Sequence, residues 1–281
     1  MKPVLLWLIA LVVSRDAGAQ NLLHRLDVVV DSATYADIAA SRFLTDYFAG
    51  RDSSIQSVSG ERARGTTFYG RNSVLSFRPR DQQHRLDNVV VVLAAERRGS
   101  IDALAARASA ERVAFDTARY RILRRESIPW RRIWQPVETG ILPARAALYV
   151  AEPEASFLAV LANSDSLGAD DLSRERLLRV SYNPKRMLGD IVAATIALGE
   201  SDIVLLTRGL VLSGASARSE PMATMVEIER SSLKFESSNS GAGIRRITLA
   251  LTRQMPGNPT YRFGYRSVLR FGPGPVAVWE F

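Results

Sequence analysis

The chain has 281 residues, of which 47% are hydrophobic and 23% are charged, so it can bury a substantial core and disorder is not expected. It contains no cysteine, which excludes disulfides, thiolate nucleophiles, cysteine-bound zinc and iron–sulfur clusters. The formal net charge is +8, but the basic residues are scattered, without the clustered stripe typical of nucleic-acid-binding proteins. We therefore expect no nucleic-acid partner.

The N-terminal residues have the pattern of a secretory signal peptide. Lys2 precedes an apolar run over residues 4–13, and small residues occupy positions 17–19. The apolar run is too short for a membrane span, which needs about 20 residues. We predict a signal peptide at 1–19 with cleavage before Gln20, followed by a soluble periplasmic or extracellular protein without a transmembrane segment.

A strand and a helix open the remaining chain. The β-branched run Leu26 to Val30 predicts the strand, and Asp31 supplies a side chain that can cap the helix that follows. The hydrophobic pattern predicts, in order, a strand at 26–30, a helix at 33–48, a polar loop at 50–60 and strands at 66–69, 73–77 and 88–93.

A similar order of elements recurs later, although few residues are identical between the two series. The second series comprises a strand at 190–198, a helix at 202–212 and strands at 224–229, 233–236 and 244–251. Between the two series we expect helices at 101–112 and 154–162 and strands at 119–123 and 146–151, with prolines interrupting residues 127–145.

The first series carries a resemblance to a known family. Leu26 to Asp31, followed by "SATY" and then "RGTTFYGRNSVLSFRP", resembles the glyoxalase-like branch of the vicinal oxygen chelate superfamily. It is closest to a bacterial family of unknown function whose corresponding stretches read "DSAT" and "GTYLYGxNTYLEhF". The resemblance is good over residues 22–93 and weak over 120–212.

The resemblance implies an α+β fold in which two βαβββ-type halves, with flanking helices, form a curved mixed sheet around a pocket. Together with the two series, it predicts one body at 20–281, with halves at approximately 22–123 and 124–252 and a C-terminal β-hairpin at 253–281.

Many members of the superfamily bind a divalent metal through His and Glu on the strands, and here this chain departs from the pattern. Ser76 stands where the family pattern has a glutamate, and Arg25 or Val28 occupies the position where a histidine is common. His24 and Glu152 are the candidate ligands that remain, which is fewer than a typical coordination set. We therefore predict no metal cofactor, with a site at His24 and Glu152 as the alternative.

Candidate ligand-binding residues lie on the strands expected to surround the pocket. Trp130 and Trp134 offer large apolar surfaces next to arginines, which suits an acidic or planar ligand, although both tryptophans could equally fill the core. Arg64, Tyr69 and Ser76 lie on the predicted strand pair.

Three functions follow from these residues. The leading interpretation is a metal-independent domain that binds a small molecule or has lost its activity, so whether the protein is an enzyme stays open. The second is a metal-dependent lyase, isomerase or dioxygenase of the vicinal oxygen chelate type. The third is a periplasmic interaction protein whose basic surface binds acidic polymers or lipids.

Overall fold

The computed structural model describes residues 21–56, 62–80, 89–123, 127–137, 146–162, 172–239 and 241–281. The expected signal peptide and His84 lie outside these residues.

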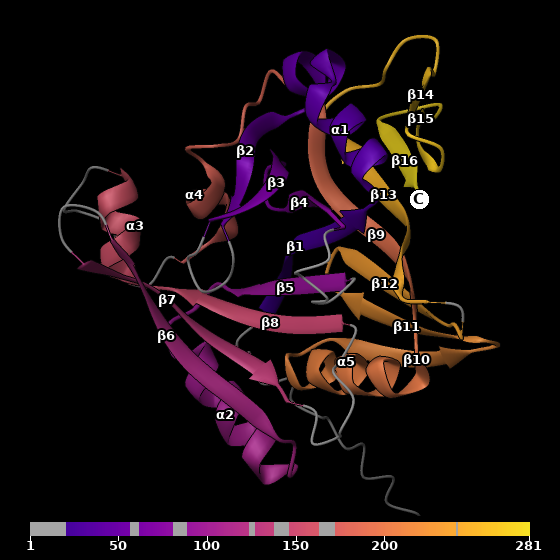
Figure 1. Cartoon of the computed structure of the whole chain (residues 1–281). Helices are drawn as coiled ribbons and strands as arrows, with labels where there is room; N and C mark the ends of the chain where they lie inside the picture. Colours follow the sequence, from indigo (N-terminus) through magenta and orange to yellow (C-terminus); the bar gives the residue numbers. More distant parts are fainter. Residues whose placement is uncertain are drawn as a thin grey trace, which may run out of the picture.

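Two eight-stranded mixed sheets make up most of the structure (Figure 1). The first sheet has the order β2-β3-β4-β1-β5-β8-β7-β6, and the second has the order β10-β11-β12-β9-β13-β16-β15-β14. The strands of the first sheet are β1 (Asn21–Val30), β2 (Gly50–Gln56), β3 (Arg62–Tyr69), β4 (Val74–Pro79), β5 (Val89–Ala95), β6 (Phe115–Leu123), β7 (Ser127–Pro136) and β8 (Ala146–Pro153). The strands of the second sheet are β9 (Leu188–Leu198), β10 (Ser216–Glu220), β11 (Ala223–Ile228), β12 (Ser231–Ser237), β13 (Gly243–Leu251), β14 (Thr260–Phe263), β15 (Ser267–Phe271) and β16 (Val276–Glu280).

Short helices connect and cover the sheets. They are α1 (Ser32–Ala40), α2 (Ser100–Ala110), α3 (Ala155–Ala162), α4 (Arg174–Leu178) and α5 (Glu200–Leu212), with a π-helical turn at Leu44–Phe48. Asp31 caps α1 as expected, because its Oδ1 accepts a hydrogen bond of 2.9 Å from the Thr34 amide. In the described part of the chain, no helix is both long and apolar enough to cross a bilayer.

Three four-stranded modules repeat one topology. Each consists of a strand, a crossover helix and three further strands, and its first and last strands lie side by side in parallel, as β1 and β4 do. The fourth module, β13 to β16, contains no helix, and its first and last strands are antiparallel. The helix explains the difference. It carries the chain back to the end of the sheet at which the first strand began, so the second strand, and after two reversals the fourth, run in the same direction as the first.

Each predicted series contains four strands, as each observed module does, but the predicted and observed sets of strands differ. Residues 50–60 were predicted to be a loop, whereas β2 begins at Gly50, and the equivalent strand β10 was not predicted. Both are edge strands, which stay polar because one side of their backbone has no neighbouring strand. The last strand of each expected series, β5 or β13, instead begins the next module.

The division of the chain also differs from the expected halves. Position 123 is the end of β6, inside the first sheet, whereas the two sheets separate between β8 and β9. The expected C-terminal hairpin contains three strands that extend the second sheet. Residues 127–136 form β7 despite Pro129, because this proline pairs with Arg121 at a register shift, where a missing amide hydrogen is tolerated.

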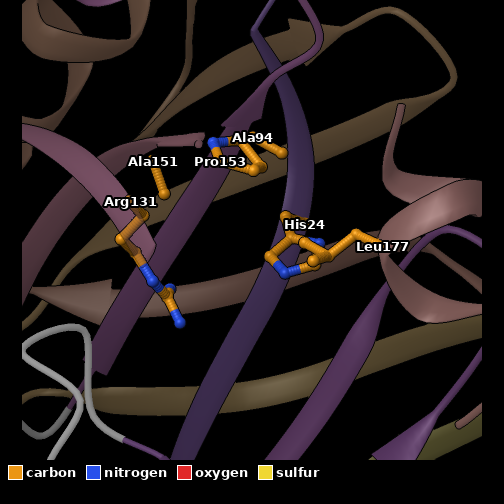
Figure 2. Close-up of a pocket in the computed structure, with 6 residues that line it drawn as sticks. All are labelled: His24, Ala94, Arg131, Ala151, Pro153 and Leu177. Atoms are coloured by element: carbon orange, nitrogen blue, oxygen red, sulfur yellow. The ribbon is translucent and has the colours of Figure 1, made fainter. Parts of the chain in front are cut away.

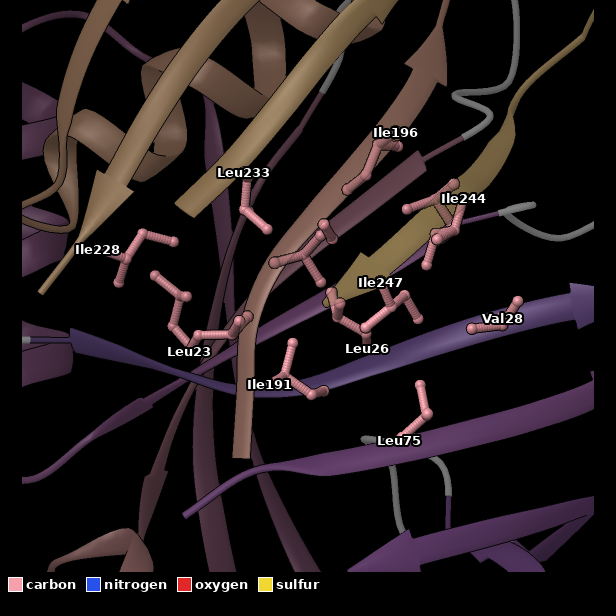
Figure 3. Close-up of a cluster of buried hydrophobic side chains, with 14 of the residues drawn as sticks. Leu23, Leu26, Val28, Leu75, Ile191, Ile196, Ile228, Leu233, Ile244 and Ile247 are labelled. Carbon is pink, nitrogen blue, oxygen red and sulfur yellow. The ribbon is translucent and has the colours of Figure 1, made fainter. Parts of the chain in front are cut away.

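The core lies between the two sheets. Leu26 and Leu75 from the first sheet meet Ile191 and Ile247 from the second in one continuous cluster of buried side chains (Figure 3). Burial of such side chains stabilises the fold by about 1.5–3 kcal/mol each. The two sheets therefore share a single core.

Aromatic side chains pack against the module that lacks a helix. Trp279 of β16 lies 4.6 Å from the Phe77 ring of the first sheet, measured between ring centroids. Phe43, which follows α1, stacks on Tyr261 of β14 at 4.0 Å. In the other modules a helix follows the first strand, but the fourth module has none. Aromatic side chains of the first module pack against it instead.

A polar contact fixes the turn between β3 and β4 against β9. Asp190 accepts hydrogen bonds from the Asn72 amide at 2.8 Å, the Asn72 side chain at 2.9 Å and the Ser73 hydroxyl at 3.0 Å. Gly70 lies so close to this strand that a Cβ atom would overlap the Gly189 carbonyl oxygen. The turn therefore needs glycine at position 70 for close approach.

Candidate functional site

Polar side chains gather on the face of the first sheet that points away from the core. Side chains alternate along a strand, so Leu26 of β1 enters the core while Arg25 and Asp27 lie on the opposite face. In the sheet register Thr67 pairs with Ser76, and Ser76 pairs with Asp27, which brings these side chains together. We call this surface the cavity face.

A cavity of about 180 Å³ lies between the cavity face and the segment that connects the two sheets. Arg25, Thr67 and Tyr69 line it from the sheet, and Leu178 and Ser181 line it from the connecting segment. Helices α3 and α4 of that segment lie beside the first sheet (Figure 1). The connecting segment therefore encloses space that the sheet alone would leave open.

His24 occupies a bulge in β1 at the centre of this site. The register with β5 shifts between Leu23 and Arg25, so both His24 and Arg25 face the cavity. His24 is only 7% exposed, and its Nδ1 atom has no hydrogen-bond partner among the residues that the structure describes. Figure 2 shows His24 on β1, with Arg131 on β7 and Leu177 on α4 around it.

Burial and three arginines keep the His24 imidazole neutral. Desolvation, followed by the charges of Arg131, Arg174 and Arg25, lowers the pKa of His24 from 6.5 to about 3. The site is thus a buried environment that disfavours protonation of the imidazole.

Two of these arginines are held by carboxylates. Both oxygens of the fully buried Asp27 carboxylate accept hydrogen bonds from Arg25, and Oδ2 also accepts one of 2.8 Å from Arg78. Arg174 Nε donates to Glu96 at 2.9 Å, and its Nη1 donates to the Leu23 carbonyl oxygen at 2.5 Å. These bonds fix the guanidinium groups in place.

The pKa values of Arg25 and Arg131 shift in opposite directions. Burial alone would lower the pKa of Arg25, but the Asp27 carboxylate more than offsets this and raises it. Burial, and then the charge of Arg25, lowers the pKa of Arg131 well below its usual value. Arginine nevertheless keeps its proton in proteins, so the repulsion between these two groups is retained.

Tyr69 joins the sheet to the connecting segment. Burial, and then the charge of Asp52, raises the pKa of Tyr69, and its hydroxyl hydrogen-bonds the Ser181 side chain. The phenol therefore stays protonated at neutral pH. Of the sequence-predicted ligand-binding residues, Tyr69 lines the cavity directly.

Ser76 lies in the floor of the site. Its side chain is fully buried, and its hydroxyl lies 3.2 Å from the Thr67 hydroxyl. At the position where the family pattern has a metal-binding glutamate, this chain therefore has a hydroxyl that hydrogen-bonds within the sheet.

The other predicted residues lie elsewhere. Arg64 is exposed, with its guanidinium carbon 5.5 Å from the centroid of the Tyr35 ring of α1. Trp134 is fully buried in the core and stacks on Phe115, so the core alternative holds for it. Trp130 belongs to β7, but its side chain is outside the described part of the structure.

Glu152 faces away from His24. In β8 it follows the same alternation as the core residues Leu148 and Val150, and it is only 4% exposed. Its carboxylate accepts hydrogen bonds from the Gly99 amide at 3.1 Å and the Ile101 amide at 2.9 Å, at the N-terminus of α2. The structure therefore does not bring Glu152 and His24 together.

The residues of the cavity do not fit the divalent metal common in the superfamily. The imidazole of His24 lies among three guanidinium groups, which would repel a cation. The residues that the structure describes include no group of three or more His, Asp or Glu side chains that could hold a metal ion.

Sequence reasoning missed the arginines as a group. Arg25 and Asp27 stand two positions apart in an apolar strand, a spacing that predicts a buried ion pair on one face. Arg131 and Arg174 come from distant segments, and no local pattern predicts that they meet His24.

Three strand-helix-strand-strand-strand modules and a fourth without a helix, paired into two eight-stranded sheets, give this chain the α+β fold that its resemblance to the glyoxalase-like branch implies. The model of a family of unknown function (DUF5829) matches residues 24–281. The chain belongs to that family.

Solved structures match this chain at low sequence identity. A hypothetical protein from Staphylococcus aureus matches with a TM-score of 0.54 and 11% identity, over 89% of this chain and 98% of that chain. An Mn(II)-bound glyoxalase from Novosphingobium aromaticivorans matches with a TM-score of 0.43 and 13% identity, over 81% of this chain and 64% of that chain. The 2,3-dioxygenase LapB from Pseudomonas sp. KL28 matches with a TM-score of 0.43 and 8% identity, over 90% and 88%. No curated protein matches significantly.

Proposed function

We propose that the cavity of the first sheet binds a small organic anion without a metal ion. The observation that carries the proposal is that Arg25 and Arg131 line the cavity beside the buried, neutral His24, while Arg174 adds positive charge from outside the lining. Guanidinium groups bind carboxylates and phosphates through paired, charge-assisted hydrogen bonds. An anion in the cavity would also offset the repulsion between Arg25 and Arg131.

Metal independence is supported by the chemistry of the same positions. A serine, Ser76, replaces the expected carboxylate ligand, and Glu152 is bonded to the N-terminus of α2. The positive charge that favours an anion disfavours a divalent cation by the same Coulomb interaction. The protein is therefore proposed as a binding domain, and catalysis is not part of the proposal.

Isothermal titration of acetate and sulfate into the wild type and two arginine variants tests this function. Arg131→Gln removes a cavity charge and is expected to weaken binding at least about tenfold. Arg132→Gln is the matched control, because Arg132 is the next residue on β7 but lies on the opposite face of the strand, where it pairs with Asp102 of α2. Equal affinity in both variants would contradict the proposal, as would anion binding that requires a stoichiometric divalent metal.

Export is the second part of the proposal, and it rests on the N-terminal sequence pattern. Expression of the full chain in a bacterial host, followed by osmotic-shock fractionation and N-terminal sequencing, checks it. We expect the protein in the periplasmic fraction, beginning at Gln20. Recovery of chains that begin at Met1 or Lys2 in the cytoplasmic fraction would rule export out.

A further inference from the structure

A second, much smaller cavity adjoins the first behind His24. Its volume is about 20 Å³, enough for one group the size of a water molecule or a methyl group. His24, Arg131 and Leu177 line both cavities, and the remaining walls of the small one are Ala94, Ala151 and Pro153 (Figure 2). Apart from His24 and Arg131, these walls are aliphatic, which suits an apolar group.

The polar side chains that line the two cavities indicate where each chemical group of a ligand would lie. Arg131 borders both cavities and Arg25 borders the larger one, so a carboxylate fits where the cavities meet. His24 also borders both, and the unpartnered Nδ1 of its neutral imidazole can accept a hydrogen bond or, in the other tautomer, donate one. Buried polar atoms are normally hydrogen-bonded, and an oxygen of the ligand would supply the partner that the described residues do not.

We propose that the site takes a short 2-hydroxy or 2-oxo acid. Its carboxylate contacts Arg131, the oxygen on the next carbon meets His24, and a methyl-sized substituent enters the small cavity between Ala94 and Ala151. This inference rests on the proposed function, since it specifies which organic anion the same cavity binds.

Calorimetric titration of the wild-type protein with propionate, lactate, pyruvate and 2-oxoisovalerate tests the assignment. We expect lactate or pyruvate to bind at least about tenfold more tightly than propionate, which has the carboxylate and the carbon chain but no second oxygen. 2-Oxoisovalerate, whose branched substituent exceeds the small cavity, should bind at least about tenfold more weakly than pyruvate. A preference for lactate or for pyruvate identifies His24 as hydrogen-bond acceptor or donor.

Two variants assign these preferences to residues. His24→Leu should bring propionate and the preferred acid to within about twofold of each other, because the hydrogen-bonding group is lost. Ala151→Val should weaken binding of the preferred acid about tenfold by filling the small cavity. Ala147→Val, on the same strand and face but outside the lining of both cavities, is the matched control and should leave affinity unchanged.

The outcomes separate this inference from the proposed function. Equal affinities for propionate, lactate and pyruvate in the wild type would overturn the assignment of a 2-hydroxy or 2-oxo acid while leaving anion binding intact. Equal effects of Ala151→Val and Ala147→Val would overturn the placement of the substituent. If none of these acids binds and acetate and sulfate also fail to bind, the proposed function itself fails.

Discussion

Burial among arginines keeps the His24 imidazole neutral, and this makes the stability of the protein depend on pH. The pKa of His24 is about 3 in the folded protein and about 6.5 in the unfolded chain, so between these values the unfolded chain binds the extra proton. The free energy of unfolding should therefore be highest above pH 6.5 and fall as the pH is lowered towards 3.

The variant His24→Gln removes this titration. Between pH 6.5 and 4.5, the free energy of unfolding of the wild type should fall by about 2–3 kcal/mol more than that of the variant. Urea unfolding followed by circular dichroism at several pH values measures the difference. If the two proteins lose stability in parallel over this interval, the imidazole is not buried as the structure shows it.

Glu152 gives a second prediction for a single residue. Its carboxylate satisfies two amides at the N-terminus of α2, so Glu152→Ala should lower the free energy of unfolding by about 1–3 kcal/mol. Glu154→Ala is the comparison, because Glu154 pairs with the exposed Arg119 and such pairs contribute only about 0–1 kcal/mol. Thermal or urea unfolding checks both, and equal losses would show that Glu152 does not cap the helix.

At the scale of structural elements, a polar contact attaches the turn between β3 and β4 to the second sheet. Asp190→Asn replaces an acceptor of three hydrogen bonds with a group that must present its own N–H donors to some of the same partners. We expect the free energy of unfolding to fall by about 1–3 kcal/mol.

The control for this element is the exposed ion pair between Arg71, in the same turn, and Glu175. Glu175→Gln should change the free energy of unfolding by less than about 1 kcal/mol, because both side chains are more than half exposed. Chemical denaturation of both variants provides the measurement. A similar loss in both would mean that the Asp190 contact does not hold the turn.

At the scale of the whole molecule, the two sheets share one hydrophobic core and should unfold together. Trp279 of the second sheet packs on Phe77 of the first, so Trp279→Phe should destabilise both sheets, by about 1–2 kcal/mol, less than the 3–5 kcal/mol typical of Trp→Ala. In this variant Trp130 and Trp134, both in β7 of the first sheet, report on unfolding of that sheet by fluorescence.

We expect the fluorescence midpoint and the circular dichroism midpoint of Trp279→Phe to fall by the same amount in urea. Wild-type protein measured by both methods provides the reference. Two separate transitions, or a fluorescence midpoint unchanged by the substitution, would show that the sheets are independent.

The sequence alone determined the strands and helices with strong hydrophobic patterns, and with them the repeated order of elements and the glyoxalase-like resemblance. The run Leu26 to Val30 and the helix capped by Asp31 are examples, because their signals lie in neighbouring residues. The polar edge strands β2 and β10 could not be found this way, since hydrogen bonds to a neighbouring strand define them and hydrophobic burial does not.

Only the tertiary structure decided the site. Local sequence placed Tyr69 on a strand near a pocket and His24 close to the start of the first strand, but strand alternation put Glu152 and Trp134 on the other face of the sheet. Arg131 and Arg174 act on His24 although they lie more than a hundred residues away along the chain. β7 is separated from β1 in the first sheet by β5 and β8 but borders the same cavity, and Arg174 of α4 hydrogen-bonds the Leu23 carbonyl oxygen of β1. The charge of the cavity is a sum over residues that are distant in sequence, and Coulomb interactions depend on their separation in space.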